Sequence, residues 1–464
     1  MRPFMDEHFL LTTGTAQEMY IAAKNAPIFD WHCHLSPKEI YEDKPFANIG
    51  EMWLAGDHYK WRGMRSCGVN EELITGTASW EDKFKAFAAC LPKLIGNPLY
   101  HWAHLELQAY FGIHTPLSEK TADEIWTQTL ELLSDGSYTP RSLIERSNVY
   151  ALCTTDDPAD SLEYHEALLK EDLPYQVLPA FRPDRALAIE APAFTDSLAA
   201  LEARVGHAVK TFADLCAALS ERIEFFASLG CKACDHAFSY VPYAEAAPEA
   251  LEGIFAARLA GETLDAKQLD QYRTALMRYL AAEYTRREWG MELHIGPMRN
   301  NNRRMFETFG PDGGFDSIDD PAIARPLSAF LGSLDYDGIL PRTILFNLNP
   351  KDSYTLGTMI GNFQGTECPG KLQYGPAWWF LDHIDGMTAQ LQQLGSLGAL
   401  ATFVGMVTDS RSFTSYPRHD YFRRIFCALV GEWVESGKFP NDTDFLKQLA
   451  FDVSFGNAKD YFGI

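Results

Sequence analysis

Short apolar runs recur along the chain, and each ends in polar residues or in glycine and proline. Runs of this length between turn-forming residues are typical of buried strands. The pattern predicts eight strands, over residues 27–34, 149–154, 175–181, 231–238, 290–295, 343–347, 375–380 and 401–408. The seventh is the weakest, because Pro376 lies inside it and cannot donate a hydrogen bond to a neighbouring strand.

Helical patterns separate successive strands, for example over residues 161–169 and 212–219. Strands that alternate with helices form parallel sheets, and eight such units predict an α/β fold, the closed (β/α)8 TIM barrel. The connection between the first two strands is far longer than an ordinary crossover and is rich in helix formers and aromatic residues. The predicted organisation is therefore the barrel start with strand one (1–35), an inserted, mostly helical subdomain over the barrel mouth (36–146) and the remainder of the barrel (147–464).

Composition excludes several classes of partner. The 464 residues carry a net charge of −23, which argues against nucleic acid or an anionic membrane as the main partner. No apolar stretch is long enough to span a bilayer, and the N-terminus shows no signal peptide. Nine scattered cysteines without an export signal favour a reducing cytoplasm.

The end of the first run carries His32-Cys33-His34. Side chains alternate along a strand, so the two imidazoles share one face and can grip one divalent metal. The run ends at the carboxyl-terminal mouth of the predicted barrel, where active sites of this fold are built. Two ordinary polar residues at a strand end would explain so short a motif equally well.

Two further strand ends carry suitable side chains. Asp409 follows the eighth strand, which neighbours the first when the barrel closes, so it is placed as a third, anionic ligand. Arg411 shares the face of Asp409 if the strand continues that far. His294 ends the fifth strand. A loop or capping acid and a core histidine are the ordinary alternatives, but four such residues on one rim favour a metal site.

Two basic groups and a tryptophan pair indicate an anionic, sugar-like substrate. The basic groups, which contain no acid, are Lys60, Arg62 and Arg65 in the insertion and Arg299, Arg303 and Arg304 after strand five. In an acidic chain such groups favour an anionic substrate, although a solvated loop explains either group alone. Trp378 and Trp379 stack on a sugar or pack the rim, and only one of two adjacent strand residues can face the mouth.

The sequence resembles the amidohydrolase superfamily and, within it, the uronate (glucuronate) isomerases. The resemblance rests on segments spread over nearly the whole chain: residues 29–35, 56–62, 180–184, 293–296 and 409–412. The superfamily lysine that bridges two metals at the end of strand four is missing, and Cys234-Asp235-His236-Ala237 stands there instead. One metal is therefore expected rather than two, and His236 is open between the core and the site.

The resemblance implies reversible aldose–ketose isomerisation of hexuronates through a cis-enediol, D-glucuronate to D-fructuronate and D-galacturonate to D-tagaturonate. The expected metal ligands are His32, His34 and Asp409, with zinc as first choice and manganese as the alternative. Asp409 is the expected base, Arg411 the carbonyl electrophile and Tyr59 the proton shuttle. The substrate-binding residues are expected to be His58, Arg182, His294, Arg299 and Trp378. We also expect a homo-oligomer.

Two other functions are compatible with the same residues. A metal-dependent hydrolase of a sugar-acid lactone or amide would use the metal to generate hydroxide, with Asp409 as base. The missing lysine and the basic insertion weigh against it. A non-catalytic sugar-acid binding protein would have no use for the complete set of His32, His34, Asp409 and Arg411.

Overall fold

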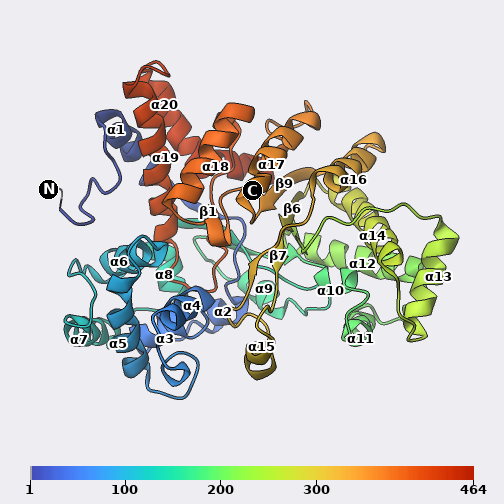
Figure 1. Ribbon diagram of the computed structural model, residues 1–464, viewed down its shortest axis with the longest axis horizontal. Helices are drawn as coiled ribbons and strands as arrows, with labels where there is room; N and C mark the ends of the chain where they lie inside the picture. Colours follow the sequence, from blue (N-terminus) through green and yellow to red (C-terminus); the bar gives the residue numbers. More distant parts are fainter. Residues whose placement is uncertain (1–2) are drawn as a thin grey trace.

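Strands lie at the centre of the molecule and helices surround them (Figure 1). The computed structural model describes residues 3–464, so residues 1–2 of the segment judged to lack a signal peptide lie outside the described part. The strands are β1 (Ile28–Asp30), β2 (Val149–Cys153), β3 (Gln176–Leu178), β4 (Ala180–Phe181), β5 (Ala233–Phe238), β6 (Gly290–Ile295), β7 (Pro297–Met298), β8 (Ser317–Ile318), β9 (Arg342–Asn347) and β10 (Leu372–Tyr374).

The helices fall into three groups along the chain. Before β2 they are α1 (Gly14–Ala23), α2 (Pro37–Glu42), α3 (Ile49–Leu54), α4 (His58–Ser66), α5 (Trp80–Cys90), α6 (Pro98–Phe111), α7 (Ala122–Leu133) and α8 (Pro140–Arg146). Between β2 and β9 they are α9 (Glu163–Leu168), α10 (Asp184–Leu187), α11 (Phe194–Val205), α12 (Phe212–Ser228), α13 (Pro248–Leu259), α14 (Ala266–Arg286), α15 (Arg303–Phe309) and α16 (Ala324–Tyr336). After β9 they are α17 (Ser353–Met359), α18 (Ile384–Leu397), α19 (Pro417–Glu435), α20 (Thr443–Phe451) and α21 (Asn457–Phe462).

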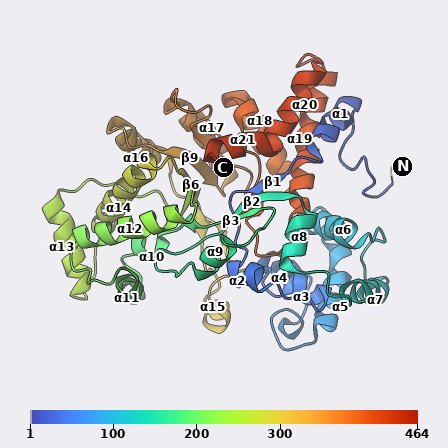
Figure 2. The same ribbon diagram turned by 180° about the vertical axis from the view of Figure 1, so that it is seen from behind.

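The main strands pair in parallel, in the order expected for successive βα units. One sheet has the order β1-β2-β3 and a second has the order β10-β9-β6-β5-β4 (Figure 2). β3 and β4 are separated only by Pro179, and main-chain bonds between Thr154 and Ala180 continue the pairing past it. The α/β class and six of the eight predicted strands are confirmed.

The last two predicted strands differ from expectation. The seventh lies at β10 rather than at 375–380, because Pro376 interrupts pairing and the chain turns into a short 3-10 helix at Trp379. Residues 401–408 form no strand. A side chain at Gly405 would lie 2.4 Å from the carbonyl oxygen of Val453, and its φ of +73° breaks the extended run. Among residues 3–464 the hydrogen-bonded sheet therefore does not close into a barrel.

The segment 403–410 nevertheless occupies the place beside β1. Oδ1 of Asp30 accepts the main-chain N–H of Thr408 at 2.7 Å, and Oδ2 accepts its hydroxyl at 2.5 Å. The N–H of Asp409 donates to the carbonyl oxygen of His32. The buried carboxylate of Asp30 therefore helps to hold this segment at the open edge of the sheet, where no further strand is paired.

Helices α2 to α8 fill the connection between β1 and β2, as the length of that connection predicted. In Figure 1 most of them gather at the lower left, and α15 projects from the lower edge of the molecule. β1 leads into α2, and β6 leads through β7 towards α15, so this edge lies at the carboxyl ends of the strands. The limits of an independent subdomain, 36–146, stay a prediction. None of the described helices has the length and apolar character needed to cross a bilayer.

Replacing Asp30 by Asn should lower the free energy of unfolding by about 1–3 kcal/mol, because an amide keeps one acceptor oxygen but turns a donor towards Thr408. Urea denaturation of the metal-free protein measures the loss. Thr408→Val removes only the hydroxyl donor and should cost less. Unfolding of Asp30→Asn at the wild-type urea concentration would show that these bonds do not hold the segment.

Candidate active site

His32, His34 and Asp409 meet at the carboxyl ends of the strands. Oδ1 of Asp409 lies 3.2 Å from Nε2 of His32 and 3.0 Å from Nε2 of His34. One ligand atom from each residue lies within 4.8 Å of the others. Two imidazole nitrogens and one carboxylate oxygen are a donor set that zinc accepts, so these residues fit a divalent metal.

His32 and His34 do not lie in a strand, contrary to the prediction. β1 ends at Asp30, but the N–H of Cys33 still donates to the carbonyl oxygen of Cys153, which keeps the two imidazoles on one side. Asp409 has a φ of +45°, a left-handed conformation that turns the chain. The strand that would have to continue to Arg411 for it to share the face of Asp409 does not form, although both residues line the same cavity.

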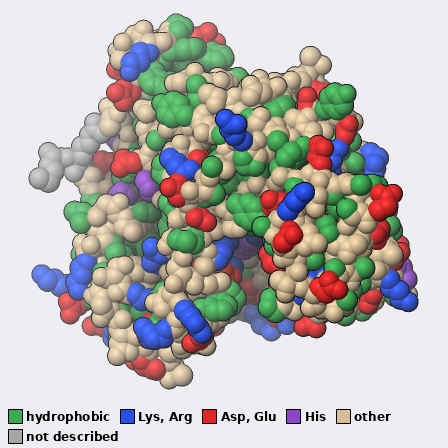
Figure 3. Space-filling view, turned by 45° about the vertical axis from the view of Figure 1, so that its right-hand side comes forward, with side chains coloured by type: hydrophobic (Ala, Val, Ile, Leu, Met, Phe, Trp, Pro, Cys, Tyr) green, Lys and Arg blue, Asp and Glu red, His purple; other side chains and the backbone are tan. Residues whose placement is uncertain are grey.

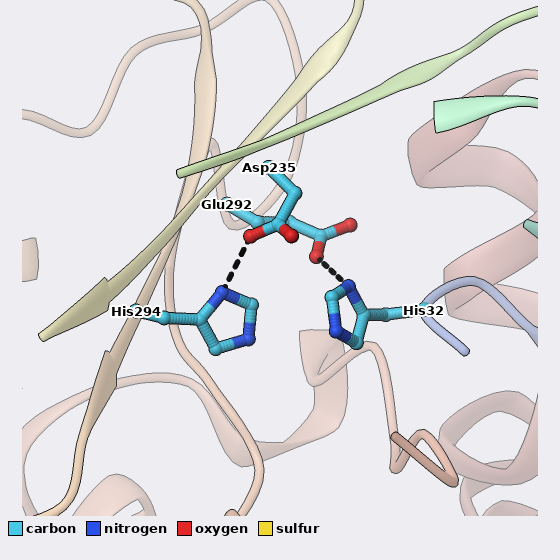
Figure 4. A group of neighbouring side chains, drawn as sticks. All are labelled: His32, Asp235, Glu292 and His294. Atoms are coloured by element: carbon cyan, nitrogen blue, oxygen red, sulfur yellow. Dashed lines mark hydrogen bonds and ion pairs between the residues drawn. The ribbon is translucent and has the colours of Figure 1, made fainter. Parts of the chain in front are cut away.

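Two buried carboxylates lie behind the imidazoles (Figure 4). Oε2 of Glu292 is 2.7 Å from Nδ1 of His32, and Oδ1 of Asp235 is 2.7 Å from Nδ1 of His294. Nη1 of Arg182 is 3.1 Å from the other oxygen of Asp235. Parallel pairing of β5 and β6 sets Asp235 beside Glu292, and His294 follows two residues later on the same face.

The buried charges favour a cation at His32. Burial lowers the pKa of His32, but the carboxylates of Glu292 and Asp235 and the contact with Asp409 outweigh burial and raise this pKa well above its ordinary value. Burial raises the pKa of Asp409, yet hydrogen bonds to His32 and His34 outweigh it and hold this pKa well below its ordinary value. The negative potential that stabilises a protonated imidazole also attracts a metal ion.

A cavity of about 390 Å³ opens beside the ligand group. It is lined by His32, His34, His58, Tyr59, Arg182, Ala237, His294, Arg299, Asn300, Pro311, Asp312, Trp378, Trp379, Asp409 and Arg411. A second cavity of about 380 Å³ adjoins it and shares His34, His58, Tyr59, Asp409 and Arg411. Figure 3 shows a hollow in the lower half of the molecule with acidic and basic side chains around it. All ten residues predicted for the site thus line one cavity, while their individual roles stay predictions.

Both tryptophans line this cavity, contrary to the expectation that only one would. They do not lie in a strand, because Trp379 begins a 3-10 helix with a φ of +50°. The indole N–H of Trp378 donates to Oδ2 of Asp409 at 2.7 Å, so it orients the carboxylate. The guanidinium of Arg299 lies 4.7 Å over the ring of Trp379 and keeps its charge at the cavity wall.

Helix α4 brings His58 and Tyr59 to the cavity. Asp57 caps the helix by accepting the N–H groups of Tyr59 and Lys60, which fixes the first turn. The rings of His58 and Tyr59 stack with centroids 4.9 Å apart. Burial, reinforced by Asp409, raises the pKa of Tyr59 well above its ordinary value, so the phenol keeps its proton at neutral pH.

Arg411 lies at the cavity mouth, where its Nη2 is 2.9 Å from Oδ2 of Asp312. The two side chains are 41% and 48% exposed, so an anion entering the cavity can compete for the guanidinium. Asp312 lies in the loop between β7 and β8 that also carries Arg299 and α15.

Most residues of the two predicted basic groups pair with other residues of the protein rather than lining the cavity. Lys60 is buried and pairs with Asp57 at 2.5 Å. Arg62 donates to the carbonyl oxygen of Asp316, and Arg65 pairs with Glu71 and donates to Gly313. Arg303 pairs with Glu307 on exposed α15. Of the two groups only Arg299 lines the ligand cavity, while Arg62 and Arg65 hold the loop between β7 and β8.

The structure shows where two residues of β5, His236 and Asp235, lie. His236 is fully buried with its ring near Tyr284 and Phe238, so it belongs to the core. Asp235 faces inward with Glu292, and the sequence reasoning assigned neither a role. The available signal was an acid inside an otherwise apolar run in each strand, since a buried carboxylate needs a partner.

Comparison with known proteins places this site in a family. A sequence model of glucuronate isomerases matches residues 1–462. The chain belongs to the glucuronate isomerase family. The uronate isomerase of Clostridium acetobutylicum is 51% identical over 465 residues, covering 100% of this chain and 99% of the relative. That of Caldanaerobacter subterraneus subsp. tengcongensis is 52% identical over 466 residues, all of both chains.

A solved uronate isomerase structure has the same fold. The crystal structure from Thermotoga maritima matches with a TM-score of 0.94 and 34% identity, covering 99% of this chain and 100% of that one. Membership of the glucuronate isomerase family confirms the resemblance drawn from the sequence and identifies the chain as an isomerase. It does not favour the hydrolase alternative.

His236 should make stability depend on acid. Both ring nitrogens lack hydrogen-bond partners, and burial lowers the pKa to about 3, whereas an unfolded histidine titrates near 6.5. Between these values only the unfolded chain binds the proton, so the contribution to stability is lost as pH falls from about 6.5 towards 3. His236→Phe should remove this loss and gain about 2 kcal/mol over the wild type between pH 7.5 and pH 5 in urea titrations. A pH-independent difference would contradict the burial of a neutral ring.

Proposed function

We propose that this protein isomerises hexuronates reversibly, D-glucuronate to D-fructuronate and D-galacturonate to D-tagaturonate. The observation that carries the proposal is one cavity in which the ligand group His32, His34 and Asp409 faces three arginines, Arg182, Arg299 and Arg411. Cations on the wall of a cavity large enough for one monosaccharide suit a substrate that is both a sugar and an anion.

One divalent metal belongs to this proposal, with zinc first and manganese second. His32, His34 and Asp409 would hold it. When bound, it supplies Lewis acidity for the oxygens of the substrate. β5 carries no lysine at residues 234–237 to bridge a second ion, which supports a single metal.

Asp409 is the proposed base that removes the C2 proton of the open-chain aldehyde and returns it to C1. Its low pKa keeps the carboxylate ionised, and the indole of Trp378 orients Oδ2. Arg411 donates to the carbonyl oxygen on which negative charge develops. Tyr59 moves the hydroxyl proton from O2 to O1, so the enediol collapses to the ketose.

Other cavity residues hold the substrate. His58, stacked on Tyr59, and His294, with an unpartnered Nε2, offer hydrogen bonds to hydroxyl groups. Arg182 and Arg299 supply positive charge, and Trp378 supplies an apolar wall. The arginines on the cavity wall suit an anion and weigh against a neutral lactone as substrate, and the complete polar set weighs against a binding protein without activity.

The proposal places the enzyme in the cytoplasm as a homo-oligomer. All nine cysteines are free thiols, which a reducing compartment maintains. Sedimentation velocity measures the oligomeric state, and fractionation of the producing cells tests the compartment.

Incubation of the zinc-loaded protein with glucuronate, galacturonate and a uronate lactone tests the function. Ketose should form from the uronates and the lactone should persist, whereas lactone hydrolysis without isomerisation would overturn the proposal. In deuterated water with excess zinc, Asp409→Asn should stop exchange at C2, because no base remains. Asp335→Asn, on exposed α16, is the control and should exchange at the wild-type rate. Wild-type exchange in Asp409→Asn would assign the base to another residue.

Tyr59→Phe should lower turnover by about 10²–10⁴-fold, the range typical for loss of a proton-transfer group. Substrate affinity should change little, because the phenyl ring keeps its packing against Trp102 and Arg418. Steady-state kinetics separate the two effects. Tyr336→Phe removes a hydroxyl from an exposed side chain and is the matched control. Near-normal turnover in Tyr59→Phe would show that Tyr59 only packs.

A further inference from the structure

The ring of His32 lies between two carboxylates. Its Nε2 faces Oδ1 of Asp409 at 3.2 Å. On the other side its Nδ1 faces Oε2 of Glu292 at 2.7 Å, as Figure 4 shows. Both the imidazole and Glu292 are removed from solvent, with exposed side-chain fractions of 2% and 0%. The two nitrogens of the ring therefore have separate partners on opposite sides.

The contact with Glu292 selects one form of the ring. A carboxylate accepts hydrogen bonds and cannot donate them, so Nδ1 carries the hydrogen. Without metal, Asp409 can accept a hydrogen from Nε2 in the same way. A bound metal would take the place of that hydrogen, and Glu292 would keep the remaining hydrogen on Nδ1, the form that a metal ligand needs. Among the described ion pairs, His34 contacts only Asp409. Of the two histidines in the candidate ligand group, only His32 therefore has a carboxylate at its second ring nitrogen.

Strand pairing on both sides fixes the position of Glu292. It lies in the middle of β6, which pairs with β5 on one side and with β9 on the other. Its only ion-pair partner among the described residues is His32, whereas neighbouring Asp235 has both Arg182 and His294. A fully buried carboxylate is costly unless a cation compensates it, and among the described ion pairs only the ring of His32 can do so for Glu292.

We propose that Glu292 is a positioning residue that fixes His32 in the orientation and tautomer required to bind the metal. The inference rests on the metal site of the proposed function. It assigns no contact between Glu292 and the substrate.

Zinc affinity, measured by competition with a chelator, tests the proposal. Glu292→Gln keeps the shape of the side chain but not its charge, and should weaken zinc binding about 10–100-fold, as loss of a partner behind a ligating histidine typically does. Asp235→Asn makes the same chemical change one strand away, behind His294. It should weaken zinc binding less than Glu292→Gln does, because Asp235 makes no ion pair with His32, and it should raise KM, because it disturbs Arg182 and His294.

The melting temperature of the metal-free protein separates positioning from packing. Without metal, Glu292→Gln should melt no lower than Asp235→Asn, because each variant removes one member of a buried ion pair and Asp235 has two partners. A melting temperature below that of Asp235→Asn, or zinc affinity equal to the wild type, would overturn the proposal. If Glu292→Gln does not fold, Glu292→Asp keeps the charge but shortens its reach, and it too should bind zinc more weakly.

Wild-type protein that binds no zinc would overturn both this inference and the metal site beneath it. Unchanged zinc affinity in both Glu292 variants would overturn this inference alone. Isomerase activity of the zinc-loaded wild type is measured on the same sample, so failure of the proposed reaction is recorded separately.

Discussion

The carboxylate of Asp30 determines where the last part of the site can form. Residues 403–410 form no strand. Main-chain bonds between Asp409 and His32 and between His34 and Ser410 hold one end of the segment, and both oxygens of Asp30 are bonded to Thr408. From there the chain has only one residue to go before Asp409 meets His32 and His34. Asp30 has a short side chain and lies in a paired strand, so it restricts the position of Thr408 closely. The distances from Asp409 to His32 and His34 are restricted with it.

One buried part of the molecule, behind His32 and His294, is polar within a largely apolar core. Glu292 and Asp235 point inward from β6 and β5, and their charges are matched by His32, His294 and Arg182. Such an interior is less stable than a hydrocarbon core of equal volume unless every group has its partner. The arrangement places negative potential beneath the ligands and positive charge on the cavity walls above them. It separates metal binding from anion binding within a few ångströms.

The fold was largely readable from the sequence because buried parallel strands appear as continuous apolar runs. The strand predictions were wrong where contacts between residues far apart in the sequence determine the local structure. Gly405 is required by the carbonyl oxygen of Val453, which no local pattern reveals. His32, His34, His294 and Asp409 were found because they lie at or just after predicted strand ends, whereas His58, Tyr59 and Arg182 came from the resemblance to uronate isomerases. The strand on which the placement of Arg411 depended does not form, because Asp409 adopts a left-handed conformation. Glu292 was overlooked because its partner is known only once strands are paired.

His32 and Asp409 are separated by 377 positions in the chain. A chain made from its N-terminus exposes both histidines long before the carboxylate that completes their ligand group exists. Chains that end before Asp409 contain the two imidazoles but not the carboxylate. Ligation therefore joins the first and last parts of the sequence. A metal that needs all three residues can be bound only after Asp409 has been made and has folded back beside β1.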